Sequence, residues 1–159
     1  MRRRRSGYRG SNARPRFVIE SQIAIFLVAA MMTGLTANVA KAGSLGPQLA
    51  DLESHIKWNA VDSAWKSLRD DWARETTGCN AAACVATQLL KLEQHVKWKA
   101  VEGSWKTRRP NWINDCKGAT TDRDVARLLL EFETNVGWDA VDAGWKNRRD
   151  SWIAELKGE

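Results

Sequence analysis

Tryptophan residues dominate the pattern of hydrophobic positions and recur at a fixed spacing. Within each of three triplets the step is seven residues, and equivalent positions of successive triplets are forty residues apart. The triplets are Trp58, Trp65 and Trp72; Trp98, Trp105 and Trp112; and Trp138, Trp145 and Trp152. Because seven residues is close to two α-helical turns, each triplet is predicted to lie along one side of a helix. The forty-residue period indicates three copies of one helical unit.

The residues between the tryptophans favour helices. The three copies span about residues 45–79, 84–118 and 124–158, and each is rich in Ala, Leu, Lys, Glu and Arg. Gly78 and Gly118 suit helix ends, and Asn80 and Thr121 suit the N-caps that follow. We therefore expect an all-α fold of three ~40-residue repeats. The simplest arrangement is an antiparallel three-helix bundle of helices about 30 residues long.

Two features complicate the long helices. In the first copy one apolar stripe includes Leu52 and Ile56, and the tryptophan stripe lies roughly 140° away around the helix. A break near Lys57, Lys97 and Gly137 would instead give stacked helical hairpins, which is the alternative architecture. Pro110 predicts a kink or a short restart in the second copy.

The N-terminal segment has the order of a secretory signal peptide. Residues 1–16 carry seven Arg and no acid, an apolar stretch follows at 23–33, and Ala40-Lys41-Ala42 resembles a cleavage site. The apolar stretch is shorter than the roughly 20 residues of a membrane span. We expect residues 1–42 to be removed near Ala42. The remaining helical-repeat domain, residues 43–159, would then be periplasmic or secreted, with a membrane attachment only if the leader is retained.

The charge of the chain belongs to this leader. The whole chain has 25 basic and 19 acidic residues, of which residues 1–42 hold eight and one. The 17 basic and 18 acidic residues that remain give a net charge of −1, so the mature domain offers no electrostatic argument for nucleic acid.

The repeated aromatic and charged positions are the candidate binding residues. Heptad-spaced tryptophans are usually core, but nine exceed what a small bundle needs, so some are expected to be partly exposed. The repeated arginines form either a solvated face that covers tryptophan rings through cation–π contacts or a ladder for an acidic partner or an anionic glycan. Acid–lysine pairs such as Asp62–Lys66 are expected to form at i,i+4. The candidate binding residues are Trp65, Arg69, Trp72, Trp105, Arg109, Trp112, Trp145, Arg149 and Trp152.

Three cysteines in a chain bound for an oxidising compartment raise the question of pairing. A Cys79–Cys84 bridge would join the first loop to the second helix and leave Cys116 unpaired. With long helices Cys116 lies beyond disulfide reach of Cys79, whereas stacked hairpins make Cys79–Cys116 possible. The residues alone leave this choice open.

No reaction is legible in the sequence. It has no Gly-rich phosphate loop, no G-x-S-x-G elbow and no H-E-x-x-H motif. His55 and His95 occupy equivalent repeat positions, but two histidines without clustered cysteines or acids are weak grounds for a metal site. We expect a non-enzymatic protein that needs no metal or cofactor.

One stretch resembles a known family. The run contains Trp65, Arg69 and Trp72, then a Cys-x(4)-Cys step from Cys79 to Cys84, and it ends near Leu92-Glu93. It is similar to the junction between modules of LprI-type lysozyme-inhibitor domains, which are small secreted α-helical domains of bacterial envelopes. The second loop here holds one cysteine and the third copy none, which departs from that family. The resemblance implies a Cys79–Cys84 bridge and packing or contact roles for Trp72 and Arg69.

The expected function is therefore that of an envelope binding protein. Its partner would be a protein, such as the lysozyme-like muramidase that the resemblance implies, or a cell-wall glycan bound by exposed tryptophans. A structural envelope repeat protein is a further alternative.

Overall fold

The computed structural model describes residues 42–158, which fold as six α-helices and two short 3₁₀ turns. These residues belong to one compact unit. The predicted signal peptide, except for its last residue Ala42, lies outside the described residues. The elements are α1 (Ala42–Ser54), α2 (Trp65–Thr77), α3 (Ala82–His95), η1 (Trp98–Ala100), α4 (Trp105–Gly118), α5 (Asp122–Asn135), η2 (Trp138–Ala140) and α6 (Ala143–Lys157).

The all-α prediction is confirmed, but the prediction of three long helices is wrong. Each repeat breaks after its first helix, at the positions of the alternative interpretation, and forms a helical hairpin. The break resolves the conflict between the two apolar stripes, because a straight helix cannot turn both toward one core. The chain leaves the helix at Val96, whose backbone is extended at φ −77° and ψ 126°, a conformation that suits a β-branched residue.

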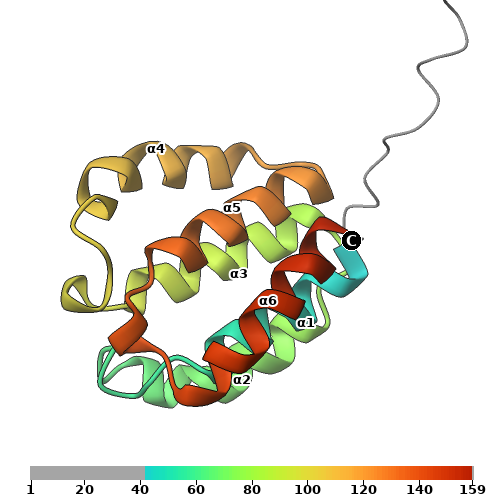
Figure 1. Cartoon of the computed structure of the whole chain (residues 1–159). Coiled ribbons are helices and arrows are strands. Elements are labelled where there is room, and N and C mark those ends of the chain that lie inside the picture. The colour runs from blue at the N-terminus through green and yellow to red at the C-terminus, as the bar shows by residue number, and fades with distance from the viewer. Residues whose placement is uncertain (1–41, 159) are drawn as a thin grey trace, which may run out of the picture. The chain divides into compact units, whose positions relative to one another are not determined.

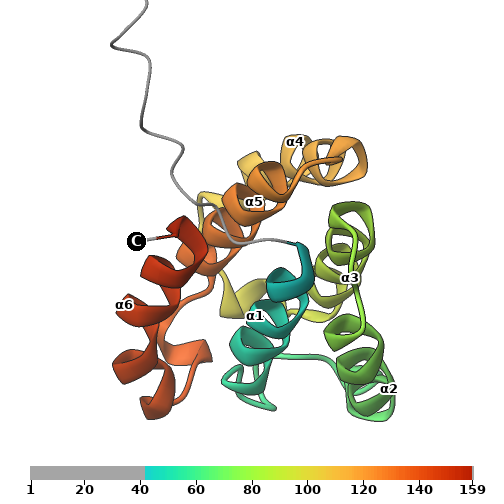
Figure 2. The same cartoon turned by 90° about the vertical axis from the view of Figure 1, so that its right-hand side faces the viewer.

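The hairpins close on one another. Helices α1, α3 and α5 pack against each other in the middle of this unit, and each second helix lies outside them (Figures 1 and 2). α2 packs against α1 and α3, α4 against α3 and α5, and α6 against α5 and α1. The last contact brings the third repeat back to the first. The hairpins are therefore arranged about a pseudo-threefold axis, and the predicted antiparallel bundle of three helices is not found.

The three segments between paired helices, residues 55–64, 96–104 and 136–142, form what we call the linker ring. Isolated β-bridges join Val61 to Val96 and Val101 to Val136, and a third bridge joins the last linker back to the first. Equivalent backbone hydrogen bonds accompany them, such as Lys97 N to the Ala60 carbonyl at 2.8 Å. Each linker thus pairs with both others, which satisfies the backbone groups that the helix break releases.

The ends of the helices follow the sequence only in part. Thr121 caps α5 by accepting a hydrogen bond from the Asp124 backbone N–H, as predicted. The cap predicted at Asn80 is wrong, because α3 begins at Ala82 and its first turn has no side-chain cap. α4 runs through Pro110 without a break. No helix among residues 42–158 has the length and apolar character that crossing a membrane requires.

Candidate functional site

The nine tryptophans divide into two classes by position in the repeat. The second and third of each triplet are buried, with at most 1 % of their surface exposed. The first of each triplet is half exposed, at 48 %, 50 % and 51 % for Trp58, Trp98 and Trp138. The sequence anticipated this mixture of core and exposed tryptophans, but the six tryptophans that it selected for binding are the buried ones. These six have no accessible surface for direct contact with a partner.

The buried tryptophans surround one buried glutamate in each repeat. In the third repeat Glu133 accepts a hydrogen bond from Trp145 Nε1 at 3.0 Å and bonds from Arg149 Nε and Nη2 at 2.6 and 2.8 Å. Glu53 and Glu93 hold equivalent tryptophans and arginines. The hydrogen bonds that Arg149 donates to Glu133 raise the pKa of Arg149, so this guanidinium stays charged. The candidate arginines Arg69, Arg109 and Arg149 are therefore committed to buried carboxylates.

The third tryptophan of each triplet ties its repeat to the next. Trp72 Nε1 donates to the Gln88 carbonyl at 3.0 Å, and Trp112 Nε1 donates to the Leu128 carbonyl at 3.1 Å. In the third repeat Trp152 Nε1 donates to the carbonyl of Gln48 at 2.9 Å, which closes the series on α1. These three hydrogen bonds connect each repeat to its neighbour.

Each half-exposed tryptophan is covered by the cations of its own repeat. The Arg69 guanidinium carbon lies 5.1 Å from the centre of the Trp58 ring, and Lys66 Nζ lies 5.8 Å from it. The same pairs recur over Trp98 and Trp138 at 5.4–5.9 Å. The predicted cation–π cover is therefore confirmed. Because Glu53 fixes Arg69, the indole above it is held in place from the core outward.

Each half-exposed tryptophan also lines a cleft. The cleft of the first repeat encloses about 510 Å³ and is lined by Trp58, Arg69, His55 and Asp142 among others. The equivalent clefts at Trp98 and Trp138 enclose about 110 and 130 Å³. Only the first falls within the roughly 300–1,000 Å³ typical of small-molecule sites.

The three half-exposed tryptophans are each followed in the sequence by residues that meet in one depression. Asn59, Lys99 and Asp139 directly follow the three half-exposed tryptophans, and together with alanines at the next positions they line one depression of about 180 Å³. The half-exposed tryptophans are therefore next in sequence to the lining of a depression that all three repeats share, and the linker ring is the candidate binding face.

Acidic residues of the linkers bond to the neighbouring repeat and not to lysines of their own. Asp62 accepts from His95 Nδ1 at 3.0 Å and from the Trp65 backbone N–H at 3.0 Å. Among the described residues Asp62 makes no ion pair with Lys66, so the predicted i,i+4 pair is wrong. The pair does not form because Asp62 precedes the first turn of α2 and is not on a helix with Lys66.

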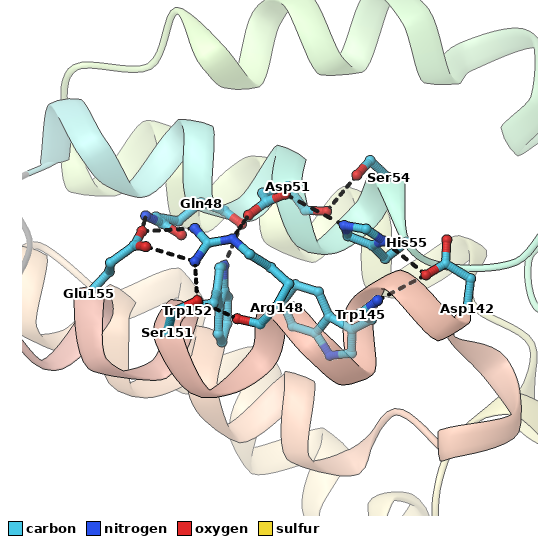
Figure 3. A network of polar contacts seen from close by, with 10 residues as sticks. All are labelled: Gln48, Asp51, Ser54, His55, Asp142, Trp145, Arg148, Ser151, Trp152 and Glu155. Carbon is cyan, nitrogen blue, oxygen red and sulfur yellow. Dashed lines mark hydrogen bonds and ion pairs between the residues drawn. The ribbon is translucent and has the colours of Figure 1, made fainter.

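The seam between α1 and α6, which joins the two ends of the repeat series, carries a polar network (Figure 3). Arg148 bonds to Asp51 at 3.0 Å and to Glu155 at 2.7 Å, and His55 bonds to Asp142 at 2.9 Å. Hydrogen bonds, first from Arg148 and then from Gln48, lower the pKa of Glu155 to about 2. The network joins α1 to α6, although the two helices lie at opposite ends of the repeat series.

The cysteines resolve the question that the sequence left open. Cys79 and Cys84 form a disulfide between the end of α2 and the start of α3, with Cα atoms 5.6 Å apart. Cys116 is free and buried at the repeat position that Thr76 occupies in the first copy. Burial raises the pKa of the Cys116 thiol to about 12, so it is a packing residue and a poor nucleophile.

Among residues 42–158 no group of three or more His, Cys, Asp or Glu side chains has the geometry to hold a metal ion. The two histidines instead bond to aspartates across repeat junctions.

Comparison with known proteins gives one finding. A family model described as a domain of unknown function, DUF8799, matches residues 81–137, which is less than half of the chain. The matched segment runs from α3 through α5 and contains one complete set of Glu93, Trp98, Trp105 and Arg109. No curated protein and no solved structure matches the chain at a significant level. None of these comparisons links the chain to LprI-type lysozyme inhibitors, so that resemblance stays a prediction.

Proposed function

We propose that this chain is a secreted, non-enzymatic binding protein that contacts a cell-wall glycan through Trp58, Trp98 and Trp138. One observation carries the proposal. Three large aromatic side chains stay half exposed at equivalent positions of the three repeats, while the other six tryptophans are buried. An exposed aromatic group held in a fixed orientation is typical of a binding surface.

The surroundings of each indole suit a sugar ring. The cations of the same repeat cover the ring from one side, and the exposed fraction near one half agrees with a second face open to solvent. Polar groups border the first cleft, including His55 and Asn59, and can exchange hydrogen bonds with hydroxyl groups. Three such positions around one axis favour a polymer with repeating units over a single small ligand, because one chain can then contact several indoles.

Removal of the open indoles tests the proposal. A variant with Trp58→Ala, Trp98→Ala and Trp138→Ala is expected to lose most of its retention on insoluble cell walls in a sedimentation assay. Leu68→Ala is a matched control, because Leu68 is also an exposed apolar side chain, at 38 %, but lies on α2. Circular dichroism and thermal unfolding establish that both variants fold. A folded triple variant that sediments with walls as well as the wild type contradicts the proposal.

Inhibition of a lysozyme-like muramidase is the second candidate. The observation in its favour is the Cys79–Cys84 disulfide, which lies where the resemblance to LprI-type domains implies it. Lysis of cell walls by lysozyme, measured at several wall concentrations, separates the two candidates. An enzyme inhibitor acts near equimolar ratio to lysozyme whatever the amount of wall, whereas a glycan binder protects only in proportion to the wall. If the protein does not slow lysis even at large excess over lysozyme, it is not an inhibitor of this enzyme.

A further inference from the structure

The three junctions of the linker ring are equivalent in backbone but differ in charge. At two of them a lysine ammonium reaches a backbone carbonyl of the preceding repeat. Lys57 Nζ donates to the Asp139 carbonyl at 3.1 Å, and Lys97 Nζ donates to the Asn59 carbonyl at 3.2 Å. Gly137 takes this position at the third junction, so the equivalent carbonyl, that of Lys99, has no such ammonium.

A second hydrogen-bonding group is missing at the same junction. Asp62 and Asp142 each bond to a histidine of the neighbouring repeat. Their counterpart is Glu102, and the counterpart of the histidines is Asn135. The amide of Asn135 is turned elsewhere: its Nδ2 donates to the Glu131 carbonyl at 2.8 Å, and its Oδ1 accepts from a serine hydroxyl.

Glu102 is therefore a carboxylate without the partner that its equivalents have. Its backbone N–H donates to the Asn135 carbonyl at 2.9 Å, but within residues 42–158 its side-chain carboxylate makes no hydrogen bond or ion pair. It lines a cleft of about 130 Å³ together with Trp138 and with Glu133 and Arg149, which form an ion pair with each other. A carboxylate and an open indole beside one cleft are the groups that recognise an ammonium ion.

We propose that the junction between the second and third repeats binds a primary ammonium group of a ligand. The Lys99 carbonyl oxygen and the Glu102 carboxylate would accept its protons beside the Trp138 indole. Lys57 and Lys97 show that an ammonium reaches the equivalent carbonyl in the other two junctions. The approach over Gly137 is open, because a Cβ at this residue would have as its nearest neighbours the Ala100 carbonyl oxygen at 3.5 Å and Glu102 Oε1 at 3.9 Å. This inference does not depend on the glycan proposal.

Titration with n-butylammonium chloride, followed by NMR on the indole and backbone N–H signals of the full-length protein, tests the site. Saturable shifts are expected at Trp138 and Gly137, with the signals of Trp58 and Trp98 unmoved as internal controls. Neutral n-butanol and sodium chloride should reproduce none of these shifts. Equal movement at all three junctions, or movement that sodium chloride reproduces, overturns the proposal.

Variants of the junction give a readout that needs no ligand. Gly137→Lys should fill the site from within, abolish the butylammonium shifts and unfold at a higher temperature than Gly137→Met, which has a long side chain without charge. Gly137→Ala should still bind the amine. Glu102→Gln should bind it about tenfold more weakly, because a charge-assisted hydrogen bond is lost. Equal melting temperatures of the Lys and Met variants, together with undiminished binding by Glu102→Gln, refute the assignment.

The source of the ammonium group is separated by comparing ligands. A short peptide with one central lysine, capped at both ends, should bind more tightly than butylammonium if the natural ligand is a lysine side chain of a partner protein. Equal affinities identify a free small amine. The same peptide with an acetylated lysine should not bind, and binding of this neutral form contradicts the proposal.

Discussion

Replacement of a buried glutamate by glutamine is the sharpest perturbation of the core. Glu133 is 5 % exposed and accepts three hydrogen bonds, one from an indole and two from Arg149. Glutamine keeps the shape of the side chain but removes its charge, and its amide NH₂ group would face the N–H groups of Trp145 or Arg149. Glu93 has the same geometry, and Glu53 has the same partners although Arg69 donates to it through Nε alone, so the experiment has two internal comparisons.

The expected cost follows from the three bonds. A hydrogen bond to a charged group contributes about 1 kcal/mol more than a neutral one, so three bonds lose about 3 kcal/mol. The side chain of Arg149 is 25 % exposed and regains some hydration when its partner is neutral. We therefore expect Glu133→Gln to lower the free energy of unfolding by about 2 kcal/mol. The losses at Glu53 and Glu93 should agree with it to within about 0.5 kcal/mol.

Urea unfolding followed by circular dichroism measures this cost as a shift of the midpoint at constant m-value. Glu75→Gln is a matched control, because Glu75 is about half exposed and forms a long, solvent-exposed ion pair of 3.5 Å with Lys91. This substitution should lower the free energy of unfolding by less than about 0.5 kcal/mol. If Glu133→Gln costs no more than Glu75→Gln, the buried glutamate does not organise the core and the reasoning is refuted.

Four further predictions concern the contact between α6 and α1, the disulfide, the free cysteine and the effect of acid. Trp152→Phe removes the N–H that donates to the α1 carbonyl, so the free energy of unfolding should fall by about 1–3 kcal/mol in urea; a loss near zero contradicts its role in connecting the repeats. Replacing Cys79 and Cys84 by serine opens a loop of sequence separation 5 and should cost about 2 kcal/mol, measured by thermal unfolding. Cys116 should react with a thiol reagent at pH 8 roughly a hundredfold more slowly, or slower still, in the folded protein than in urea, because burial raises its pKa to about 12; equal rates refute its burial. Hydrogen bonds from the α6 backbone, and from the imidazole of the neighbouring repeat, lower the pKa of Asp142. The stability that wild type holds over Asp142→Asn at pH 7 should therefore disappear as the pH falls below 3.8, and a difference that persists at pH 2 contradicts this cause.

The spacing of the tryptophans predicted the repeat, the helical class and a mixture of buried and exposed indoles. It did not predict which indoles are exposed. Trp58 and Trp65 are seven residues apart and would share one side of a continuous helix, but the chain breaks between them. Trp58 then lies on the linker ring, outside the core that takes Trp65.

The break itself depends on contacts that local sequence does not contain. Residues 55–64 include Ala60 and Lys57, which are compatible with a helix. The extended conformation is stabilised by hydrogen bonds to residues far away in the sequence. Lys57 N donates to the carbonyl of Ala140, for example. The Asp62–His95 bond across a junction also replaces a pair that helical spacing alone predicted. Arg69 was selected correctly as a repeated cation over an indole, but its buried glutamate partner was not anticipated.

The most direct test of the proposed binding face is an NMR titration of the nine tryptophan indole N–H signals with soluble cell-wall glycan fragments. The account predicts that the signals of Trp58, Trp98 and Trp138 shift in a saturable manner while the six buried indoles stay still. Shifts confined to the buried indoles, or no shift at millimolar ligand, would contradict the claim that these three side chains form the binding face.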